Sequence, residues 1–157
     1  MTVEAELGRL SETEDDLTVE DYDAKLTDVN QAQEFIDETG IDALAVCIGN
    51  VHGKYPASGP KLRLQLLKEL YDLASKNGVF LVLHGASGLP KELVQECIEL
   101  GVRKFNVNTE VRKAYMDILK SPEAHTDLVH VMAAAKEAMK VMVAEKMQLF
   151  GSVGKAN

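Results

Sequence analysis

The chain has 157 residues, of which 46% are apolar and 27% charged, and its formal net charge is −8. This length is enough for one hydrophobic core and too short for two large domains. A net negative surface repels nucleic acid and anionic membranes, and no apolar run reaches the roughly 18 residues of a membrane span, so we expect neither partner.

Two cysteines, Cys47 and Cys97, lie inside apolar segments and lack the short spacing of a redox or metal motif. Such cysteines are typical of buried thiols in a reducing compartment. The chain also opens without a basic and apolar leader. We therefore expect a cytoplasmic protein.

Short apolar runs alternate with helical patterns along the chain. Strands are expected in residues 2–8, 42–48, 79–83 and 102–107. Helices are expected from Asp28 to Gly40, from Leu62 to Gly78, from Pro90 to Ile98, from Val111 to Ser121 and from about Asp127 to Phe150.

This alternation predicts an α/β fold with a parallel sheet, because parallel neighbours need crossover connections. Four β/α units make half of a TIM (β/α)₈ barrel, and an open doubly wound sheet fits the same periodicity. We expect a single domain over residues 1–157. It has a first strand and an acidic loop in 1–27, the β/α units in 28–120, and a long terminal helix with its tail in 121–157.

Polar residues follow three of the expected strands, in segments 49–53, 84–88 and 106–110. Small residues from Gly85 to Gly88 lead into a helix, so their backbone N–H groups are suited to binding a phosphate. His52 and His84 stand at the ends of neighbouring strands, which brings two imidazoles to one rim. Neutral imidazole is a common zinc ligand, although two ligands are too few for a complete site.

Each of these features also has an ordinary structural explanation. A histidine at a strand end is often satisfied by a backbone carbonyl, and small residues before a helix are common in turns. Asn106 and Thr109 are suited to capping the helix that follows them. The acidic residues near the start of the chain are equally typical of a solvated face: Glu4, Glu6, Glu12, Glu14, Asp15 and Asp16.

Four motifs together resemble one family. The segments "AELGRL", "IGNVHGKY", "LVLHGASGL" and "KFNVNTEVRKAY" are similar, in this order, to the second half of class II, zinc-dependent ketose-bisphosphate aldolases, which cleave fructose or tagatose bisphosphates. The similarity runs from about Val3 to Phe150. It implies strands five to eight of a (β/α)₈ barrel, with their helices.

The resemblance also implies roles for individual residues. His52 and His84 match two zinc ligands, and Glu6 matches a carboxylate near an alternative metal position. Glu14 matches the carboxylate on the family's mobile loop that moves a proton beside the ketone. The remaining matches hold the substrate, largely its dihydroxyacetone phosphate part: Gly53, Gly85, Ala86, Ser87, Asn106, Val107, Asn108 and Thr109.

Two departures from the family pattern leave the activity open. The third zinc histidine and its neighbouring aspartate have no counterpart, because no Asp-His pair occurs in the chain. Ser11 and Glu12 also replace glycines that often occur in the family's loop. Two function classes follow: an aldolase that obtains the missing residues elsewhere, or a non-catalytic aldolase-like module that binds phosphate or metal.

A half-barrel leaves its first and last strands with open edges, and it leaves inward side chains without the opposite half. We therefore expect the chain to form a homodimer or a higher homo-oligomer.

Overall fold

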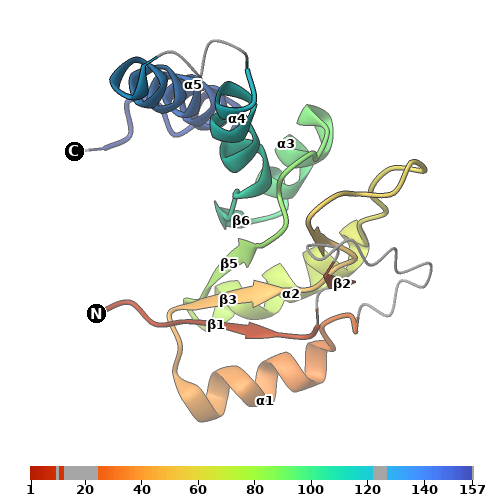
Figure 1. Ribbon diagram of the computed structural model, residues 1–157. Coiled ribbons are helices and arrows are strands. Elements are labelled where there is room, and N and C mark those ends of the chain that lie inside the picture. Colours follow the sequence, from red (N-terminus) through yellow and green to blue (C-terminus); the bar gives the residue numbers. More distant parts are fainter. Residues whose placement is uncertain (10, 13–24, 122–126, 157) are drawn as a thin grey trace. The chain divides into compact units, whose positions relative to one another are not determined.

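The computed structural model describes residues 1–9, 11–12, 25–121 and 127–156 (Figure 1). The chain divides into two compact units, Met1–Asn106 and Val107–Asn157. The single domain expected from the sequence stays a prediction.

The first unit is built on a four-stranded parallel sheet in the order β1-β3-β5-β6. These strands are β1 (Glu4–Leu7), β3 (Ala43–Val46), β5 (Phe80–Leu83) and β6 (Val102–Phe105). All four predicted strands are present, each shorter than expected. The predicted α/β class with a parallel sheet is therefore confirmed.

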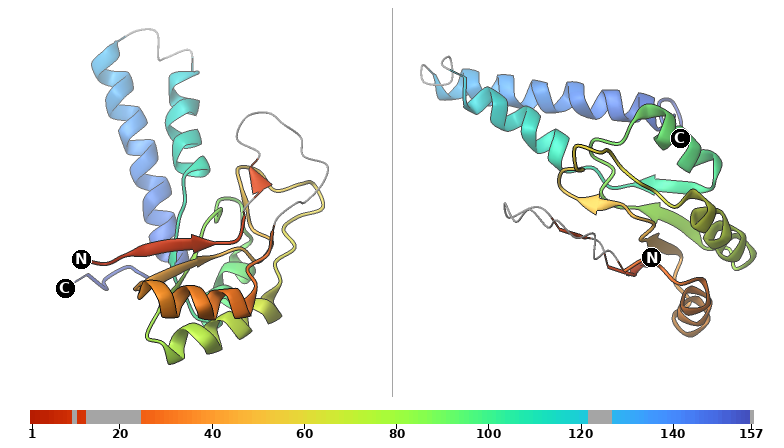
Figure 2. Two further views of the ribbon diagram at one scale, coloured as in Figure 1. Left: turned by 90° about the horizontal axis from the view of Figure 1, so that it is seen from below. Right: turned by 90° about the vertical axis from the view of Figure 1, so that its right-hand side faces the viewer.

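Three helices belong to this unit: α1 (Val29–Thr39), α2 (Leu64–Lys76) and α3 (Lys91–Glu99). Figure 2 shows all three on one side of the sheet. The strands also follow one another across the sheet in chain order. A doubly wound fold has helices on both faces and a point where the strand order reverses, so this arrangement is that of a barrel segment.

Helix α1 begins and ends where the sequence predicts. The Asp28 side chain accepts hydrogen bonds from the backbone N–H groups of Asn30 and Gln31, at 2.9 and 3.0 Å. Gly40 ends the helix with a φ of 62°, a left-handed conformation that glycine adopts without strain.

The core lies between the sheet and α2. It is formed by fully buried leucines and valines of β3, β5 and α2: Leu44, Val46, Leu67, Leu70, Leu81 and Leu83. The alternate positions Ala43, Ala45 and Val82 form a smaller buried cluster on the opposite face of the sheet. This second face also bears the candidate site.

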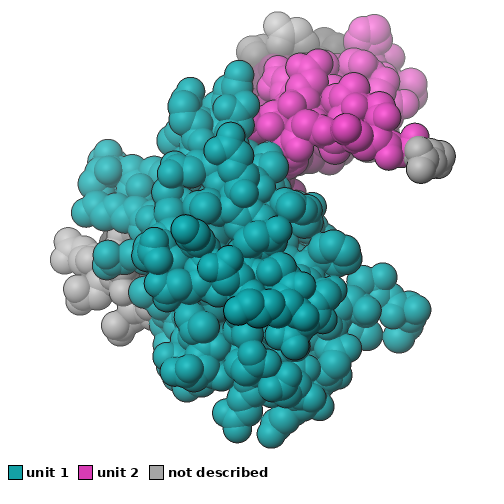
Figure 3. Space-filling model, turned by 180° about the vertical axis from the view of Figure 1, so that it is seen from behind, with its two compact units in different colours: residues 1–106 teal, residues 107–157 magenta. Residues whose placement is uncertain are grey.

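The second unit, drawn in magenta in Figure 3, contains α4 (Thr109–Leu119) and α5 (Leu128–Leu149). The two helices lie side by side (Figure 2). Glu110 of α4 and Lys146 of α5 form an ion pair of 2.6 Å between them. None of the described helices has the length and apolar composition needed to cross a membrane.

The sequence does not predict a second, two-stranded sheet. β2 (Ser11–Glu12) pairs in parallel with β4 (Val51–His52), and the register places Glu12 beside His52. Two-residue strands are too short to produce a hydrophobic pattern. The start of α2 also differs from the prediction, because the helix begins at Leu64 and leaves Leu62 outside.

Candidate active site

The two histidines singled out in the sequence lie close together. His52 is the last residue of β4, and His84 directly follows β5. Their rings stack with centroids 5.9 Å apart and planes inclined by 21°. The ends of two strands thus present two imidazoles at one place, as the sequence predicts, and their role as metal ligands stays a prediction.

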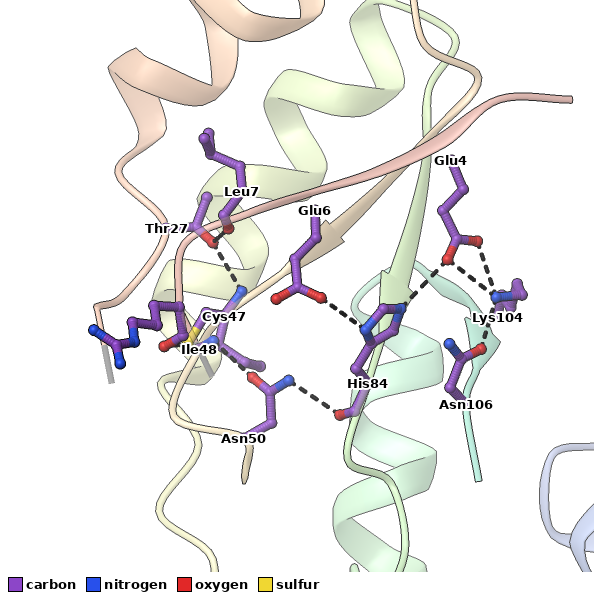
Figure 4. A network of polar contacts seen from close by, with 11 residues as sticks. Glu4, Glu6, Leu7, Thr27, Cys47, Ile48, Asn50, His84, Lys104 and Asn106 are labelled. Carbon is purple, nitrogen blue, oxygen red and sulfur yellow. Dashed lines mark hydrogen bonds and ion pairs between the residues drawn. The ribbon is translucent and has the colours of Figure 1, made fainter. Parts of the chain in front are cut away.

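Both ring nitrogens of His84 face carboxylates of β1 (Figure 4). Nδ1 lies 2.8 Å from Oε2 of Glu6, and Nε2 lies 3.3 Å from Oε1 of Glu4. Glu4 and Glu6 are two residues apart on one strand, so their side chains share the sheet face that His84 also occupies. A neutral imidazole carries a single N–H, so the ring can donate to one of these carboxylates only.

Lys104 of β6 completes this group of side chains. Its Nζ lies 2.9 Å from Oε2 of Glu4 and 2.6 Å from Oδ1 of Asn106. Burial would raise the pKa of Glu4, but the hydrogen bonds from Lys104 and His84 outweigh it and hold that pKa below its ordinary value. Glu4 is therefore a carboxylate anion at neutral pH.

The loop before His52 is fixed to the strand end that carries His84. Asn50 is fully buried; its Oδ1 accepts from the N–H of Ile48 at 2.8 Å, and its Nδ2 donates to the carbonyl of His84 at 3.0 Å. A buried amide that satisfies two backbone groups holds both segments in one geometry. The spacing of the two histidines thus depends on Asn50.

Gly85 lies against the backbone of β4. Its φ is +64°, and a Cβ at this position would come within 2.0 Å of the carbonyl oxygen of Val51. Only glycine permits so close an approach. The hydroxyl of Tyr55 also donates to the carbonyl of Gly85 at 3.0 Å, so the residue after His84 is held from two sides.

The predicted phosphate-binding segment follows Gly85. Ala86 and Ser87 are both buried. The N–H of Ala86 donates to the carbonyl of Asn106 at 3.3 Å, while the N–H of Asn106 donates to the carbonyl of Leu83 at 3.0 Å. Backbone hydrogen bonds of Asn106 therefore link the two predicted substrate-binding segments, which begin at Gly85 and at Asn106. The Ala86 N–H would have to exchange its partner to bind an anion.

A further set of hydrogen bonds joins residues that come before and after Glu14, the predicted proton-transfer residue, in the sequence. The Thr27 hydroxyl donates to the carbonyl of Leu7 at 2.6 Å and accepts from the N–H of Cys47 at 2.8 Å. Arg9 pairs with Lys25 in an antiparallel bridge. Glu14 itself lies outside the described residues.

The structure thus collects part of the predicted set in the first unit: Glu6, His52, Gly53, His84, Gly85, Ala86, Ser87 and Asn106. Val107, Asn108 and Thr109 belong to the second unit, where Asn108 precedes α4 and makes no side-chain capping hydrogen bond. The N-cap residue of α4 is Asn108, whereas the side chain of Asn106 accepts a hydrogen bond from Lys104.

Three residues of the site were not singled out by the sequence. Glu4 fits a solvated acidic face, Lys104 is one charged residue in an exposed part of a strand, and Asn50 is one polar residue in a loop. Alternation along β1 does place Glu4 on the face of Glu6. No comparable signal links Glu4 to Lys104, which lies 100 positions later.

The donor set in this chain is incomplete for zinc. Within residues 1–9, 11–12, 25–121 and 127–156, no group of three or more His, Cys, Asp or Glu side chains is arranged to hold a metal ion. A structural or catalytic zinc site uses three or four protein ligands. His52 and His84 alone therefore do not make a zinc centre.

Comparisons with known proteins identify the family. The family model described as class II fructose-bisphosphate aldolase matches residues 1–155. A solved structure from Coccidioides immitis, provisionally named a fructose-1,6-bisphosphate aldolase, is 34% identical with a TM-score of 0.88, over 99% of this chain and 54% of that one. The YdjI aldolase from Escherichia coli K12 is 36% identical with a TM-score of 0.77, over 100% of this chain and 50% of that one.

A third structure, fructose-bisphosphate aldolase from Campylobacter jejuni, shares the fold at 20% identity and a TM-score of 0.67, over 83% of this chain and 47% of that one. The chain spans about half the length of these structures. The prediction of four β/α units forming half of a TIM barrel, with a long C-terminal helix, is thereby confirmed. By this match over nearly its whole length, the chain belongs to the class II fructose-bisphosphate aldolase family.

Proposed function

We propose that this chain supplies half of the active site of a zinc-dependent class II aldolase, which reversibly cleaves a ketose phosphate or bisphosphate to dihydroxyacetone phosphate and an aldehyde. One observation carries the proposal. The rings of His52 and His84 stack 5.9 Å apart beside Glu6, at strand ends of a chain in this family.

We propose that this chain supplies only some of the ligands of the zinc ion. His52 and His84 would be two of its ligands, with Glu6 as a third group at an alternative position. The remaining ligand and the acid that protonates the aldehyde oxygen would come from outside these 157 residues. Zinc held there would act as a Lewis acid and stabilise the negative charge that develops on the substrate oxygen as the carbon–carbon bond is cleaved.

The chain's own residues would bind and orient the substrate. Gly53, Gly85, Ala86 and Ser87 would hold the phosphate of dihydroxyacetone phosphate through backbone N–H groups and the Ser87 hydroxyl. Asn106, Val107, Asn108 and Thr109 would hold the rest of this moiety. Fixing the phosphate fixes the reacting carbon, which lowers the entropic part of the activation free energy.

Glu14 would exchange the proton at the carbon beside the ketone. A carboxylate performs this step when it lies within hydrogen-bond reach of the carbon-bound proton. Support comes from β2, since its register sets the backbone of Glu12, two residues earlier, beside His52.

We also propose a cytoplasmic location, supported by Cys47 and Cys97, which are both free and buried.

We further propose a homodimer or higher homo-oligomer. It is supported by the sheet, because β1 and β6 are its outer strands and each pairs with a single neighbour among the described residues. Sedimentation equilibrium tests this, and a stable monomer at all concentrations would contradict it.

The alternative is a non-catalytic aldolase-like module. It is favoured by the incomplete donor set among the described residues. Such a module would keep the phosphate-binding segment and work through association, without turnover.

An aldol-cleavage assay on the purified chain separates these functions. Fructose 1,6-bisphosphate is supplied with zinc or with a chelator, and binding of zinc and dihydroxyacetone phosphate is measured in parallel. Chelator-sensitive turnover that is lost in His84→Ala would show that the assembled chain completes the site. Binding of both ligands without turnover would support the half-site, and binding of neither would refute the proposal.

A further inference from the structure

The two outer strands of the four-stranded sheet carry opposite charges. β1 contains Glu4 and Glu6, and β6 contains Arg103 and Lys104. Among the described residues each of these strands pairs with a single neighbour, β1 with β3 and β6 with β5. The free edge of a parallel sheet presents backbone N–H and C=O groups that a further strand can bind. One edge is therefore acidic and the other basic.

The two edges are complementary, but they do not pair with each other within one chain. β3 and β5 lie between them, and three spacings of about 4.8 Å separate the outer strands by about 14 Å along the sheet. Only long side chains cross this distance: Nζ of Lys104 lies 2.9 Å from Oε2 of Glu4 (Figure 4). No described strand covers the outer side of β1 or of β6.

The sheet face that bears His84 also exposes a large apolar side chain. The three helices of the first unit lie on the other face (Figure 2). Phe80 pairs in register with Ala43, so their side chains share the face of His84. Phe80 is 59% exposed, whereas the neighbouring cluster of Ala43, Ala45 and Val82 is buried. Packing a second layer against this face would remove the Phe80 ring from water, which is favourable.

A second copy of the chain fits both edges at once. A (β/α)₈ barrel closes eight parallel strands around one axis and leaves no edge. Two copies related by a two-fold rotation about that axis supply eight parallel strands, with β6 of each copy beside β1 of the other. The contact joins different edges, so it occurs twice and closes into a ring. The solved aldolases to which the chain is similar are about twice its length, which agrees with two copies per barrel.

Charge favours this arrangement over the other ways of pairing the edges. β6 beside β1 brings the arginine and lysine of one copy near the two glutamates of the other, and opposite charges on neighbouring strands are stabilising. β1 beside β1, or β6 beside β6, would bring like charges together and would leave the other edge of each copy open.

We propose that two copies of this chain close a single barrel, in which β6 of each copy pairs in parallel with β1 of the other and the basic residues of β6 attract the acidic residues of β1. This inference rests on the proposed function in one respect, that the chain forms a homodimer. It needs no metal, no substrate and no turnover.

Hydrogen exchange followed by mass spectrometry tests the pairing on the unmodified chain. Samples are taken above and below the concentration at which sedimentation equilibrium shows the dimer to dissociate. We expect the amides of β1 and of β6 both to exchange more slowly in the dimer, and to lose this protection on dilution, because each strand gains a hydrogen-bonded neighbour. The amides of β3 and β5 are the internal control, since these strands already have a neighbour on each side.

Charge reversal tests the same contact through variants. Arg103→Glu with Lys104→Glu makes β6 acidic, and Glu4→Lys with Glu6→Lys makes β1 basic. Each double variant alone should raise the Kd of the dimer by about 10-fold or more, since like charges meet at both contacts. Lys140→Glu is the control, because it reverses a charge in an exposed ion pair of α5 and should leave the Kd unchanged.

An equimolar mixture of the two double variants should restore the dimer, because both contacts of the mixed dimer join opposite charges. Mixing cannot repair the pair of Lys104 and Glu4 within one chain, so recovery reports a contact between chains. If either variant fails to fold, the exchange experiment on the wild type still decides.

Three results would overturn the inference: a mass other than that of a dimer at all concentrations, protection confined to one outer strand or to other elements, or folded variants whose mixture stays dissociated. Binding of zinc and dihydroxyacetone phosphate to the same samples decides the aldolase proposal separately. A dimer protected at both strands that binds neither ligand leaves this inference standing and refutes the half-site. A monomer that binds both ligands does the opposite.

Discussion

Gly85 fixes the geometry directly after His84, since its missing Cβ lets the chain pass the carbonyl of Val51. Gly40 provides a matched comparison, because its φ of +62° is similar but a Cβ added there would meet no atom within 4 Å, whereas at Gly85 the nearest atom would be 2.0 Å away. A side chain at Gly85 therefore brings backbone strain and a clash, and one at Gly40 brings strain only.

We expect Gly40→Ala to lower the free energy of unfolding by about 1 kcal/mol, the cost of a left-handed alanine. Gly85→Ala should lower it by about 3 kcal/mol or more, because the backbone of β4 has to move as well. Urea denaturation measures both values. Equal losses in the two variants would contradict the close approach at Gly85.

Cys97 gives a prediction for alkaline pH. It is fully buried, and burial raises the pKa of its thiol from 9.0 to about 11. Between these values the unfolded chain loses the thiol proton while the folded chain keeps it, so stability falls as pH rises. The loss is about 1.4 kcal/mol per pH unit within this window and is absent below it.

Cys97→Ala removes this titration. We expect the difference in unfolding free energy between wild type and Cys97→Ala to be constant up to pH 9 and to shift against the wild type by about 2 to 3 kcal/mol by pH 11. Measuring both proteins by urea denaturation across the range cancels other titrating groups. A constant difference throughout would show that the thiol pKa is not raised.

At the scale of single residues, the sequence predicts the location of site residues that directly follow an apolar run, because such a run marks a strand and therefore its end. His52 and His84 follow apolar runs, so their meeting follows from the parallel sheet. Glu4 and Lys104 could not be predicted as partners, because they lie 100 positions apart on the first and last strands of the sheet and no local pattern links them. The burial of Asn50 could not be predicted either, because an asparagine in a loop is ordinarily exposed.

At the scale of elements, helix α1 tests how strongly a capping residue matters. The Asp28 carboxylate accepts from two backbone N–H groups that no helical carbonyl satisfies. Asp28→Ala should destabilise the protein by about 1 kcal/mol, while Asp28→Asn should cost little, because asparagine caps helices as well as aspartate does. Thermal unfolding checks this; an Asp28→Asn loss as large as that of alanine would indicate a purely electrostatic role.

The predicted elements were correct in type and order because strands and helices of four or more residues leave a periodic hydrophobic pattern. Their ends are less accurate: the sequence predicts Val107 in a strand that ends at Phe105, and Leu62 in a helix that begins at Leu64. The pair β2 and β4 was missed. Its two-residue strands exist through backbone pairing between distant segments, which no local pattern encodes.

For the whole molecule, the central question is whether half of an aldolase fold retains half of its site. The chain matches about half of each solved aldolase to which it is similar. Its described residues nevertheless bring together two stacked imidazoles, two carboxylates and a lysine, from strands of both sheets.

Isothermal titration calorimetry of the purified chain with zinc tests this account most directly, using His84→Ala, His52→Ala and the control His130→Ala. His130 lies in α5 of the second unit. Because this chain supplies only part of a zinc site, the account predicts weak binding of one zinc ion per chain for wild type and His130→Ala, and affinity at least about 10-fold lower still after loss of either site histidine. No zinc binding by the wild type, or equal binding by all four proteins, would contradict it.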